Sequence, residues 1–356
     1  MKEELRLHLF YNHFDLILWG FGTFFISALL TYFFIKEKII PNRYSSDLLT
    51  GSQKIHVDNV KRIGGLPIIS SILIIFLIQF FYLEKGDYSL YNVLFYCIFI
   101  FAIGFTEDLI KDIRPISRLV VLFIITLIWL IYYKNLIYST NIDFVDDIIK
   151  LEIFALSLTT ICIIASLNST NMMDGANGLL TMFSVFVCMI LLIYSIEAKN
   201  YILVNFLTIL TCSLFGFLIF NWPKGFIFLG DGGSYFLGAI LSTLLIYMSN
   251  NLNNFNMLNA LIIMIYPIWE LMFTIFRRLY FSSNIVKPDN LHLHTILHAN
   301  IKKINFTKKK SFNKNALTGL LINIIALLPS SIFLIYKSGN ILEDRESLGF
   351  FITFFS

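Results

Sequence analysis

The sequence predicts an all-α polytopic integral membrane protein, and three observations lead to this fold class: composition, the length of the apolar runs, and the placement of charge. The 356 residues are 57% hydrophobic and 16% aromatic, with only 14% charged residues. This is far more apolar than a soluble domain. No separate soluble domain stands out, so we expect a single membrane domain over residues 1–356.

Ten apolar runs predict ten transmembrane helices. A helix needs about 20 apolar residues to cross ~30 Å of hydrocarbon. The final stretch, 348–356, is too short for a straight crossing, so an eleventh span stays open. The ten runs lie near 14–35, 66–83, 88–105, 116–133, 151–167, 176–195, 201–220, 233–249, 256–276 and 316–336.

Basic residues set the predicted orientation, because short cytoplasmic loops retain Lys and Arg. With the N-terminus outside, most of the 27 Lys and Arg fall in the inner loops. A basic inner face suits an anionic substrate and anionic lipid head groups. Five polar motifs share this predicted cytoplasmic side: 54–67, 104–115, 168–179, 228–238 and 287–298.

The motif at 228–238, FLGDGGSYFLG, sets one carboxylate, Asp231, among glycines. The glycines permit positive φ and a close approach by another molecule, and Ser234 can cap the helix that follows. A lone carboxylate repels phosphate, so an anionic ligand here requires a divalent cation between them, as Mg²⁺ provides. The alternative is a glycine-rich turn with a helix-capping Asp.

An acidic cluster follows the third predicted span. Asp108 and Asp112 share a helix face if the helix continues to about Arg114, whereas Glu107 points elsewhere. Like charges at this spacing are destabilising, which suggests a compensating cation. The candidates are Mg²⁺, Lys111, Arg114 and Arg118.

Amide and carboxylate side chains recur every three residues between the fifth and sixth spans. Asn168, Asn171 and Asp174 therefore line one side of a helical end, which Gly175 and Gly178 then interrupt. The alternative is an ordinary turn rich in Asn and Gly.

Basic residues before the second span include Lys54 and Arg62. They can neutralise phosphate, or they belong to an ordinary positive-inside loop.

The ninth span carries a carboxylate, Glu270. An intramembrane carboxylate faces the bundle interior or an aqueous cavity by default, and Thr274 and Arg277 share its helix face. Snorkelling beside Arg277 is the alternative.

Three histidines, His292, His294 and His298, lie in the last large loop. On a helix His294 and His298 form an i,i+4 pair suited to zinc, whereas on an extended segment His292 and His294 share a face. No nearby acid or Cys completes a zinc site, so we favour phosphate binding.

Together the motifs resemble the polyprenyl-phosphate N-acetylhexosamine-1-phosphate transferase family. FLGDGGSYFLG is similar to the family's F-x-G-D-x-G-S-x-x-L-G, which implies that Asp231 is the Mg²⁺ ligand. NSTNMMDGANGL resembles N-x-x-N-x-x-D-G-x-D/N-G-L, which implies Asn171 as a second metal or phosphate contact and Asn177 near the uracil.

Two motifs depart from the family pattern. Glu107 replaces the first Asp of the acidic D-D-x-x-D pattern, as in a bacterial branch that assembles O-antigen or other surface glycans. KPDNLHLHTILH is similar to the P-D-x-x-H-I-H-H loop of the GlcNAc-type enzymes, with Thr295 in place of the third His. The three consecutive histidines of the MurNAc-pentapeptide enzymes are missing, which counts against a peptidoglycan substrate.

The motifs and the resemblance together define the expected site. We expect catalytic roles for Glu107, Asp108, Asp174 and Asp231, metal ligation by Asp231 and Asn171, and substrate contacts from Asn168, Asn171, Asn177, Lys54, Arg62, His292 and His294. The resemblance implies transfer of a sugar-1-phosphate from a UDP-N-acetylhexosamine to undecaprenyl phosphate, with release of UMP and with Mg²⁺, or alternatively Mn²⁺, as cofactor. It also implies the bacterial inner membrane, an active site on the cytoplasmic face and contact with membrane lipid.

Three other readings stay open. They are a MurNAc-pentapeptide phosphotransferase, a secondary transporter and a membrane scaffold that has lost catalysis. We expect no nucleic-acid partner, and a homodimer is an open alternative.

Overall fold

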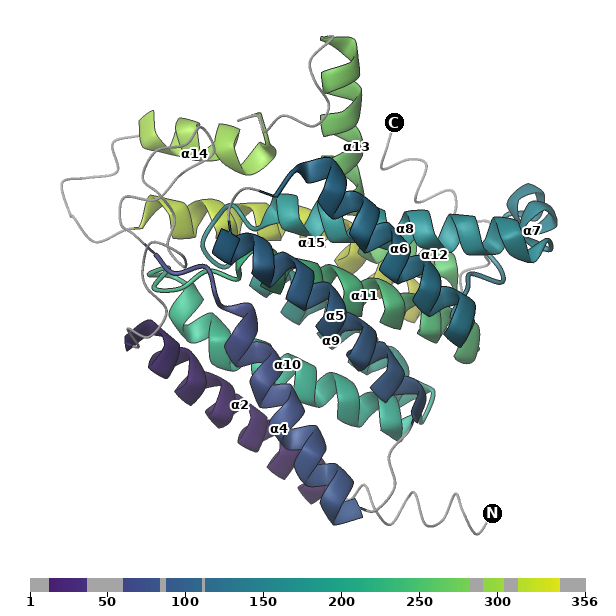
Figure 1. Ribbon diagram of the computed structural model, residues 1–356, viewed down its shortest axis with the longest axis horizontal. Helices are drawn as coiled ribbons and strands as arrows, with labels where there is room; N and C mark the ends of the chain where they lie inside the picture. The colour runs from purple at the N-terminus through teal and green to yellow at the C-terminus, as the bar shows by residue number, and fades with distance from the viewer. Residues whose placement is uncertain are drawn as a thin grey trace.

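The computed structural model is an all-helical bundle over the residues that it describes (Figure 1). These residues are 13–36, 60–83, 88–110, 113–281, 291–303 and 313–339. Lys54 and the short apolar stretch 348–356 lie outside them. The helices are α2 (His13–Lys36), α4 (Gly65–Leu83), α5 (Tyr88–Ile110), α6 (Pro115–Tyr133), α7 (Asp143–Ile149), α8 (Glu152–Met173), α9 (Leu179–Glu197), α10 (Tyr201–Asn221), α11 (Gly230–Asn251), α12 (Met257–Ile263), α13 (Ile265–Tyr280), α14 (Leu293–Lys303) and α15 (Lys314–Gly339).

The chain is a polytopic membrane protein, with fewer clear spans than predicted. Within the described ranges, 8 helices are long and apolar enough to cross a membrane, or 9 if the bent pair α12 and α13 counts as one span. The prediction of ten is therefore too high by this measure. The remaining predicted run, 66–83, does form a helix, α4, but its apolar part, Gly65–Phe81, is shorter than the other spans.

The predicted span 256–276 is broken rather than straight. Helices α12 and α13 meet at Met264 with a bend of 70°. Pro267 explains the break, because proline has no N–H to donate to the carbonyl of Ile263, where α12 ends, and its ring clashes with that carbonyl. As a result α13 projects away from the other helices (Figure 1).

Helix α11 forms the centre of the bundle. It packs against α5 and α8, while α10 packs against α2 and α9. Nearly all of its side chains are buried, from Gly232 in the first turn to Met248 in the last. The first turn of α11 therefore sits where several other helices end or begin, and this places Asp231 among them.

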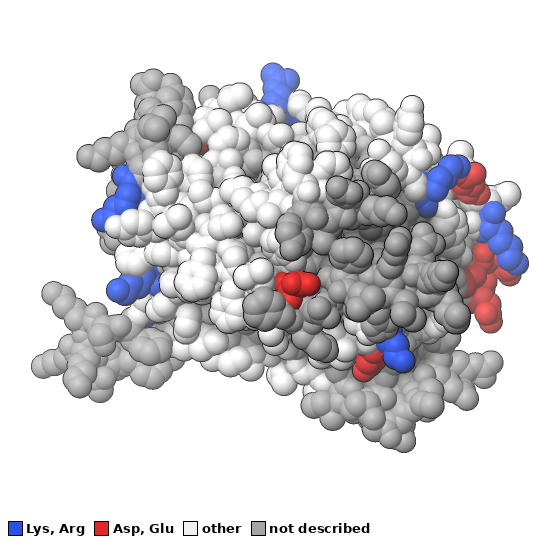
Figure 2. Space-filling model, turned by 90° about the horizontal axis from the view of Figure 1, so that it is seen from below, with Lys and Arg blue, Asp and Glu red and all other residues white. Residues whose placement is uncertain are grey.

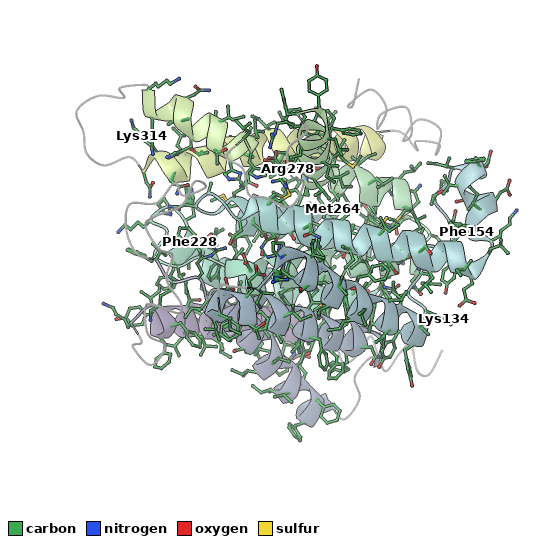
Figure 3. All side chains as sticks on the ribbon, turned by 45° about the horizontal axis from the view of Figure 1, so that its top comes forward. Lys134, Phe154, Phe228, Met264, Arg278 and Lys314 are labelled. Carbon is green, nitrogen blue, oxygen red and sulfur yellow. The ribbon has the colours of Figure 1, made fainter. Side chains whose placement is uncertain are left out.

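The polar motifs meet at one end of the bundle, here called the motif end. Figure 3 shows Phe228 and Lys314 at this end and Lys134 and Phe154 at the opposite end. The motif end holds Arg62 before α4, Asp108 near the end of α5, Asp174 after α8, Asp231 at the start of α11 and His292 before α14. On the face drawn in Figure 2, charged side chains gather mainly towards the two ends of the molecule.

Candidate active site

A short backbone pairing joins the segment before α4 to the segment before α11. Phe228 donates its N–H to the carbonyl of Lys61 at 2.9 Å, and the carbonyl of Phe228 accepts from the N–H of Gly64 at 2.8 Å. Gly65 N–H donates to the carbonyl of Leu229 at 3.2 Å. This parallel pairing links segments that are more than 160 residues apart and sets Arg62 beside Asp231.

Asp231 is the centre of a hydrogen-bonded network. Its Oδ1 accepts from Arg62 Nη2 at 2.9 Å and from Asn171 Nδ2 at 2.9 Å. The same Asn171 nitrogen lies 3.0 Å from Ser234 Oγ. The structure thus brings together three residues predicted for the site, and it turns the Asn171 amide so that its oxygen lies on the side away from Asp231.

Asp108 caps the start of α11 from a different helix. Its Oδ1 accepts from the N–H of Asp231 at 3.0 Å and its Oδ2 from the N–H of Gly232 at 2.9 Å. These N–H groups have no acceptor within α11, and the positive end of the helix dipole favours a carboxylate there. The Asp108 side chain is only 3% exposed, with Arg62 Nε 4.0 Å away. Both oxygens of Asp108 are therefore committed to holding the first turn of α11.

Two glycines make this arrangement sterically feasible. Gly230 has φ +76°, and a Cβ there would lie 2.3 Å from the carbonyl oxygen of Arg62. A Cβ on Gly104 would lie 2.6 Å from the carbonyl oxygen of Asp231. A side chain at either position would push α5, α11 and the segment before α4 apart.

Glu107 points away from Asp108, as predicted, and pairs with Arg118 at the start of α6. The Arg118 guanidinium also lies over the ring of Tyr235, 5.4 Å from its centroid. Glu107 Oε2 is buried and has no hydrogen-bond partner among the described residues. Arg118 is thus the cation that compensates Glu107. Helix α5 ends at Ile110 rather than near Arg114, and Lys111 and Asp112 lie outside the described residues.

The remaining polar residues after α8 have other partners. Asn168 Nδ2 donates to the carbonyl of Ile164 at 2.8 Å, and Asp174 is the C-cap of α8. Asn177 donates its N–H to Asn315 Oδ1 at 3.0 Å and its Nδ2 to the carbonyl of Pro223 at 3.0 Å. No hydrogen bond within the described ranges joins Asn168 or Asn177 to Asp231.

The histidines form a second cluster, between α13, α14 and α8. The rings of His292 and His294 are parallel, with centroids 5.6 Å apart. His294 lies against the loop after α8, because a Cβ on Gly175 would be 2.1 Å from His294 Nε2. Burial, followed by the neighbouring His292, lowers the pKa of His294 to about 4, so its imidazole is neutral at pH 7.

The zinc alternative finds no support in this cluster. His294 and His298 do form an i,i+4 pair on α14, but His298 Nδ1 lies 3.1 Å from Thr318 Oγ1. In the part of the chain that the structure describes, no three His, Cys, Asp or Glu side chains are placed to hold a metal ion.

The oxygen donors around Asp231 fit a hard divalent cation. Asp231 offers its carboxylate oxygens, and the unpartnered buried Glu107 Oε2 belongs to the same group of charges, whereas Asn171 presents its amide nitrogen to Asp231. Mg²⁺ commonly takes only one or two protein carboxylates and completes its shell with water and substrate phosphate. The residues present therefore suit Mg²⁺ together with a phosphate ligand, whereas the protein side chains alone do not enclose the ion.

One buried residue that organises this end was missed as a site residue. Asn221, the last residue of α10, donates Nδ2 to the carbonyl of Ile227 at 2.9 Å. Its Oδ1 accepts from the N–H of Gly178 at 3.0 Å and from Thr181 Oγ1 at 3.1 Å. A buried amide at the end of an apolar run was the available signal, because such a group needs partners.

Comparison with known proteins shows what this chain is similar to. The protein-family model described as Glycosyl transferase family 4 matches residues 90–249, which include the acidic cluster, Asn171 and Asp231. The chain is 28% identical to a probable undecaprenyl-phosphate N-acetylglucosaminyl 1-phosphate transferase of Bacillus subtilis (strain 168), over 77% of this chain and 76% of that protein. It is 26% identical to an undecaprenyl-phosphate alpha-N-acetylglucosaminyl 1-phosphate transferase of Thermotoga maritima, over 79% of this chain and 80% of that protein.

A relative with another substrate name is similar to the same degree. The phospho-N-acetylmuramoyl-pentapeptide-transferase of Vesicomyosocius okutanii is 28% identical, over 85% of this chain and 89% of that protein. The motifs, the geometry of the motif end and these similarities agree: the chain is similar to glycosyl transferase family 4 over residues 90–249, and to transferases of undecaprenyl phosphate over most of its length.

Proposed function

We propose that this chain is a polyprenyl-phosphate sugar-1-phosphate transferase. It takes the sugar-1-phosphate of a UDP-N-acetylhexosamine, joins it to undecaprenyl phosphate and releases UMP, forming undecaprenyl-diphospho-N-acetylhexosamine. The observation that carries the proposal is the network of Arg62, Asn171, Asp108 and Asp231 at the end of a membrane bundle. The similar proteins, which are named as transferases of the same kind, support this reaction class.

The reaction requires two anions to meet. An oxygen of the lipid phosphate bonds to the β-phosphorus of the UDP-sugar, and the bond from that phosphorus to the bridging oxygen breaks, so UMP leaves with that oxygen. Phosphoryl transfer of this kind depends on positioning and charge neutralisation more than on covalent help from the protein. A phosphate monoester has its second pKa near ~6, so the lipid phosphate is largely ionised at neutral pH without a protein base.

The residues of the network have separate roles in this proposal. A divalent cation, Mg²⁺ or alternatively Mn²⁺, would supply neutralisation of the diphosphate charge when bound at Asp231 and at Asn171, with the Asn171 amide rotated to present its oxygen. Arg62 adds a fixed positive charge beside Asp231, 2.9 Å away. Asp108 holds the first turn of α11, and with it the side chain of Asp231, in place. Asp174 and Glu107 stay predicted catalytic residues.

The substrate in this proposal is of the GlcNAc type, for a bacterial surface glycan such as O-antigen. Thr295 stands where the loop would carry a third histidine, and its Oγ1 hydrogen-bonds to the carbonyl of His292 at 2.7 Å. The Thr295 hydroxyl donates its hydrogen to the backbone of its own turn, so it does not donate that hydrogen to a MurNAc-pentapeptide substrate.

The test is a transfer assay with purified protein, undecaprenyl phosphate and radiolabelled UDP-sugars. UMP and labelled lipid should form with a UDP-N-acetylhexosamine and should require Mg²⁺ or Mn²⁺. Product from UDP-MurNAc-pentapeptide instead would favour peptidoglycan synthesis. No UMP from any donor, with solute uptake into vesicles, would favour the transporter reading, which the clustering of polar residues at one end argues against.

The proposed location is the bacterial inner membrane with the motif end in the cytoplasm, where UDP-sugars are found. Single cysteines test this in a background without the four native cysteines. Lys224→Cys at the motif end should resist an impermeant thiol reagent in intact cells, whereas Asn141→Cys at the opposite end should react. Reaction of Lys224→Cys from outside would overturn both the orientation and the proposed reaction.

A further inference from the structure

Glu270 is a buried carboxylate for which the proposed reaction has no use. It lies on α13 and is 4% exposed. Its Oε1 lies 3.1 Å from Nδ1 of His292 and accepts from the N–H of Leu293 at 3.1 Å. A buried carboxylate is retained only where it is paired and hydrogen-bonded, so these contacts explain how the side chain is tolerated.

The bend at Met264 is what brings Glu270 to the histidines. Pro267 lies in the first turn of α13 and causes the bend between α12 and α13. Glu270 follows about one turn later on α13. Arg277 lies two turns after Glu270 on the same helix, and its Nη1 donates to the carbonyl of Leu291 at 2.5 Å. Helix α13 thus holds the segment 291–293 by two charged side chains.

The contacts of Glu270 continue into the proposed site. Glu270 bonds His292, the ring of His292 stacks on His294, and His294 lies against Gly175, next to Asp174. One carboxylate oxygen receives both the side chain of His292 and the backbone of Leu293, so the ring is held relative to its own main chain. The hydrogen bond made by one histidine nitrogen decides which role the other can take.

We propose that Glu270 is a positioning residue that orients His292, with the Nδ1–H of the ring donated to the carboxylate and Nε2 presented towards the diphosphate of the substrate. This inference rests on the proposed function, in which His292 contacts the substrate. It assigns to an intramembrane acid the task of aligning a substrate-binding side chain rather than carrying ions or protons.

The first test compares Glu270→Gln with Glu270→Ala. Gln keeps an oxygen that accepts from Leu293 but removes the charge, and Ala removes the anchor altogether. We expect kcat/KM for the UDP-sugar to fall by about 10-fold in Glu270→Gln and about 100-fold in Glu270→Ala, the range found when the partner that orients a metal-binding histidine is removed. The matched control is Glu197→Gln, an exposed carboxylate at the opposite end of the bundle, which should behave as wild type.

A double-variant cycle separates positioning from general structural support. If Glu270 acts through His292, Glu270→Gln should have no further effect in a His292→Asn background, within about twofold, because the two residues form one unit. The thermal midpoint of Glu270→Gln should stay close to that of wild type while kcat/KM falls. The inference is overturned if the losses of kcat/KM in the two single variants multiply in the double variant. It is also overturned if the thermal midpoint of Glu270→Gln falls together with its kcat/KM.

The same assay distinguishes the two proposals. If wild type transfers the sugar-1-phosphate and both Glu270 variants match it, only the positioning role is overturned. If wild type transfers no sugar-1-phosphate, the proposed function is overturned, and the positioning role with it.

Discussion

The Asp231 cluster and the histidine cluster lie at the same end of the bundle but are built on different physical terms. Around Asp231, carboxylates are held by Arg62 and by backbone N–H groups of a helix start. Around His292 a single carboxylate, Glu270, holds stacked imidazoles, and the pKa of His294 is lowered to about 4. The first cluster depends on the charges of its side chains, and the second depends on how its imidazole rings pack. Substitutions that remove charge but keep shape should therefore harm the first cluster more.

The largest effect is expected from Asp231→Asn. The change keeps the side-chain shape but removes a hard ligand and the partner of Arg62. Transfer should fall below detection in the UMP assay, while the thermal midpoint stays near that of wild type. Full activity at low millimolar Mg²⁺ would disprove the metal assignment.

Asp108→Asn should come next, with a loss on the order of 10²-fold in kcat, because a displaced first turn of α11 misplaces Asp231. The amide has only one oxygen for the two N–H groups of Asp231 and Gly232, so one of them loses its acceptor. An unsatisfied buried N–H costs about 1–3 kcal/mol, which should appear as a lower thermal midpoint. Wild-type turnover would show that the start of α11 does not depend on this cap.

Gly175→Ala tests the second cluster by shape alone. No charge changes, but the added methyl would meet His294 Nε2 and displace the ring. We expect kcat/KM to fall on the order of 10-fold, because small misplacements of binding groups are costly. The matched change Gly22→Ala adds a methyl on α2 at an ordinary contact distance, and it should leave the rate unchanged. Equal rates in both variants would show that the packing of His294 is not required.

The smallest effect concerns pH and stability. Burial lowers the pKa of His294 and of His298 to about 4, with His292 and Lys302 respectively adding to the shift. Between pH 6.5 and 4 the unfolded chain then binds more protons than the folded one, so stability is complete above about pH 6.5 and falls as pH falls. Each histidine contributes a slope of up to about 1.4 kcal/mol per pH unit.

Thermal unfolding in detergent at a series of pH values measures this slope. His298→Gln should make the decline between pH 6.5 and 5 shallower, with His294 still present. An unchanged slope in that variant would show that His298 does not take up its proton on unfolding.

Much of the fold could be predicted from apolar run length alone. The predicted runs 116–133 and 201–220 agree closely with α6 (Pro115–Tyr133) and α10 (Tyr201–Asn221), because hydrocarbon excludes charge and demands helix over a fixed thickness. The break at Met264 was not predicted, although Pro267 was visible. The run 256–276 is apolar on both sides of the bend, so its composition alone does not show that the helix changes direction there.

The choice of partners in the site could not be predicted. Arg114 and Arg118 were both candidate cations for the acidic cluster, and Arg118 pairs with Glu107. Arg62 was predicted to neutralise phosphate, and it pairs with Asp231. Likewise Glu270 bonds His292, 22 residues away, whereas helical spacing pointed to Thr274 and Arg277.

The sequence by itself determined that this chain spans a membrane, and it predicted the polar side chains that the structure brings to the motif end. Only the tertiary structure decided how those side chains are paired. Helical periodicity relates residues within a turn or two, so it identifies faces. The contact between Arg62 and Asp231 depends instead on the pairing of residues 61–65 with 227–229 and on the close packing of Gly104 and Gly230. These contacts exist only after helices distant in sequence have packed together.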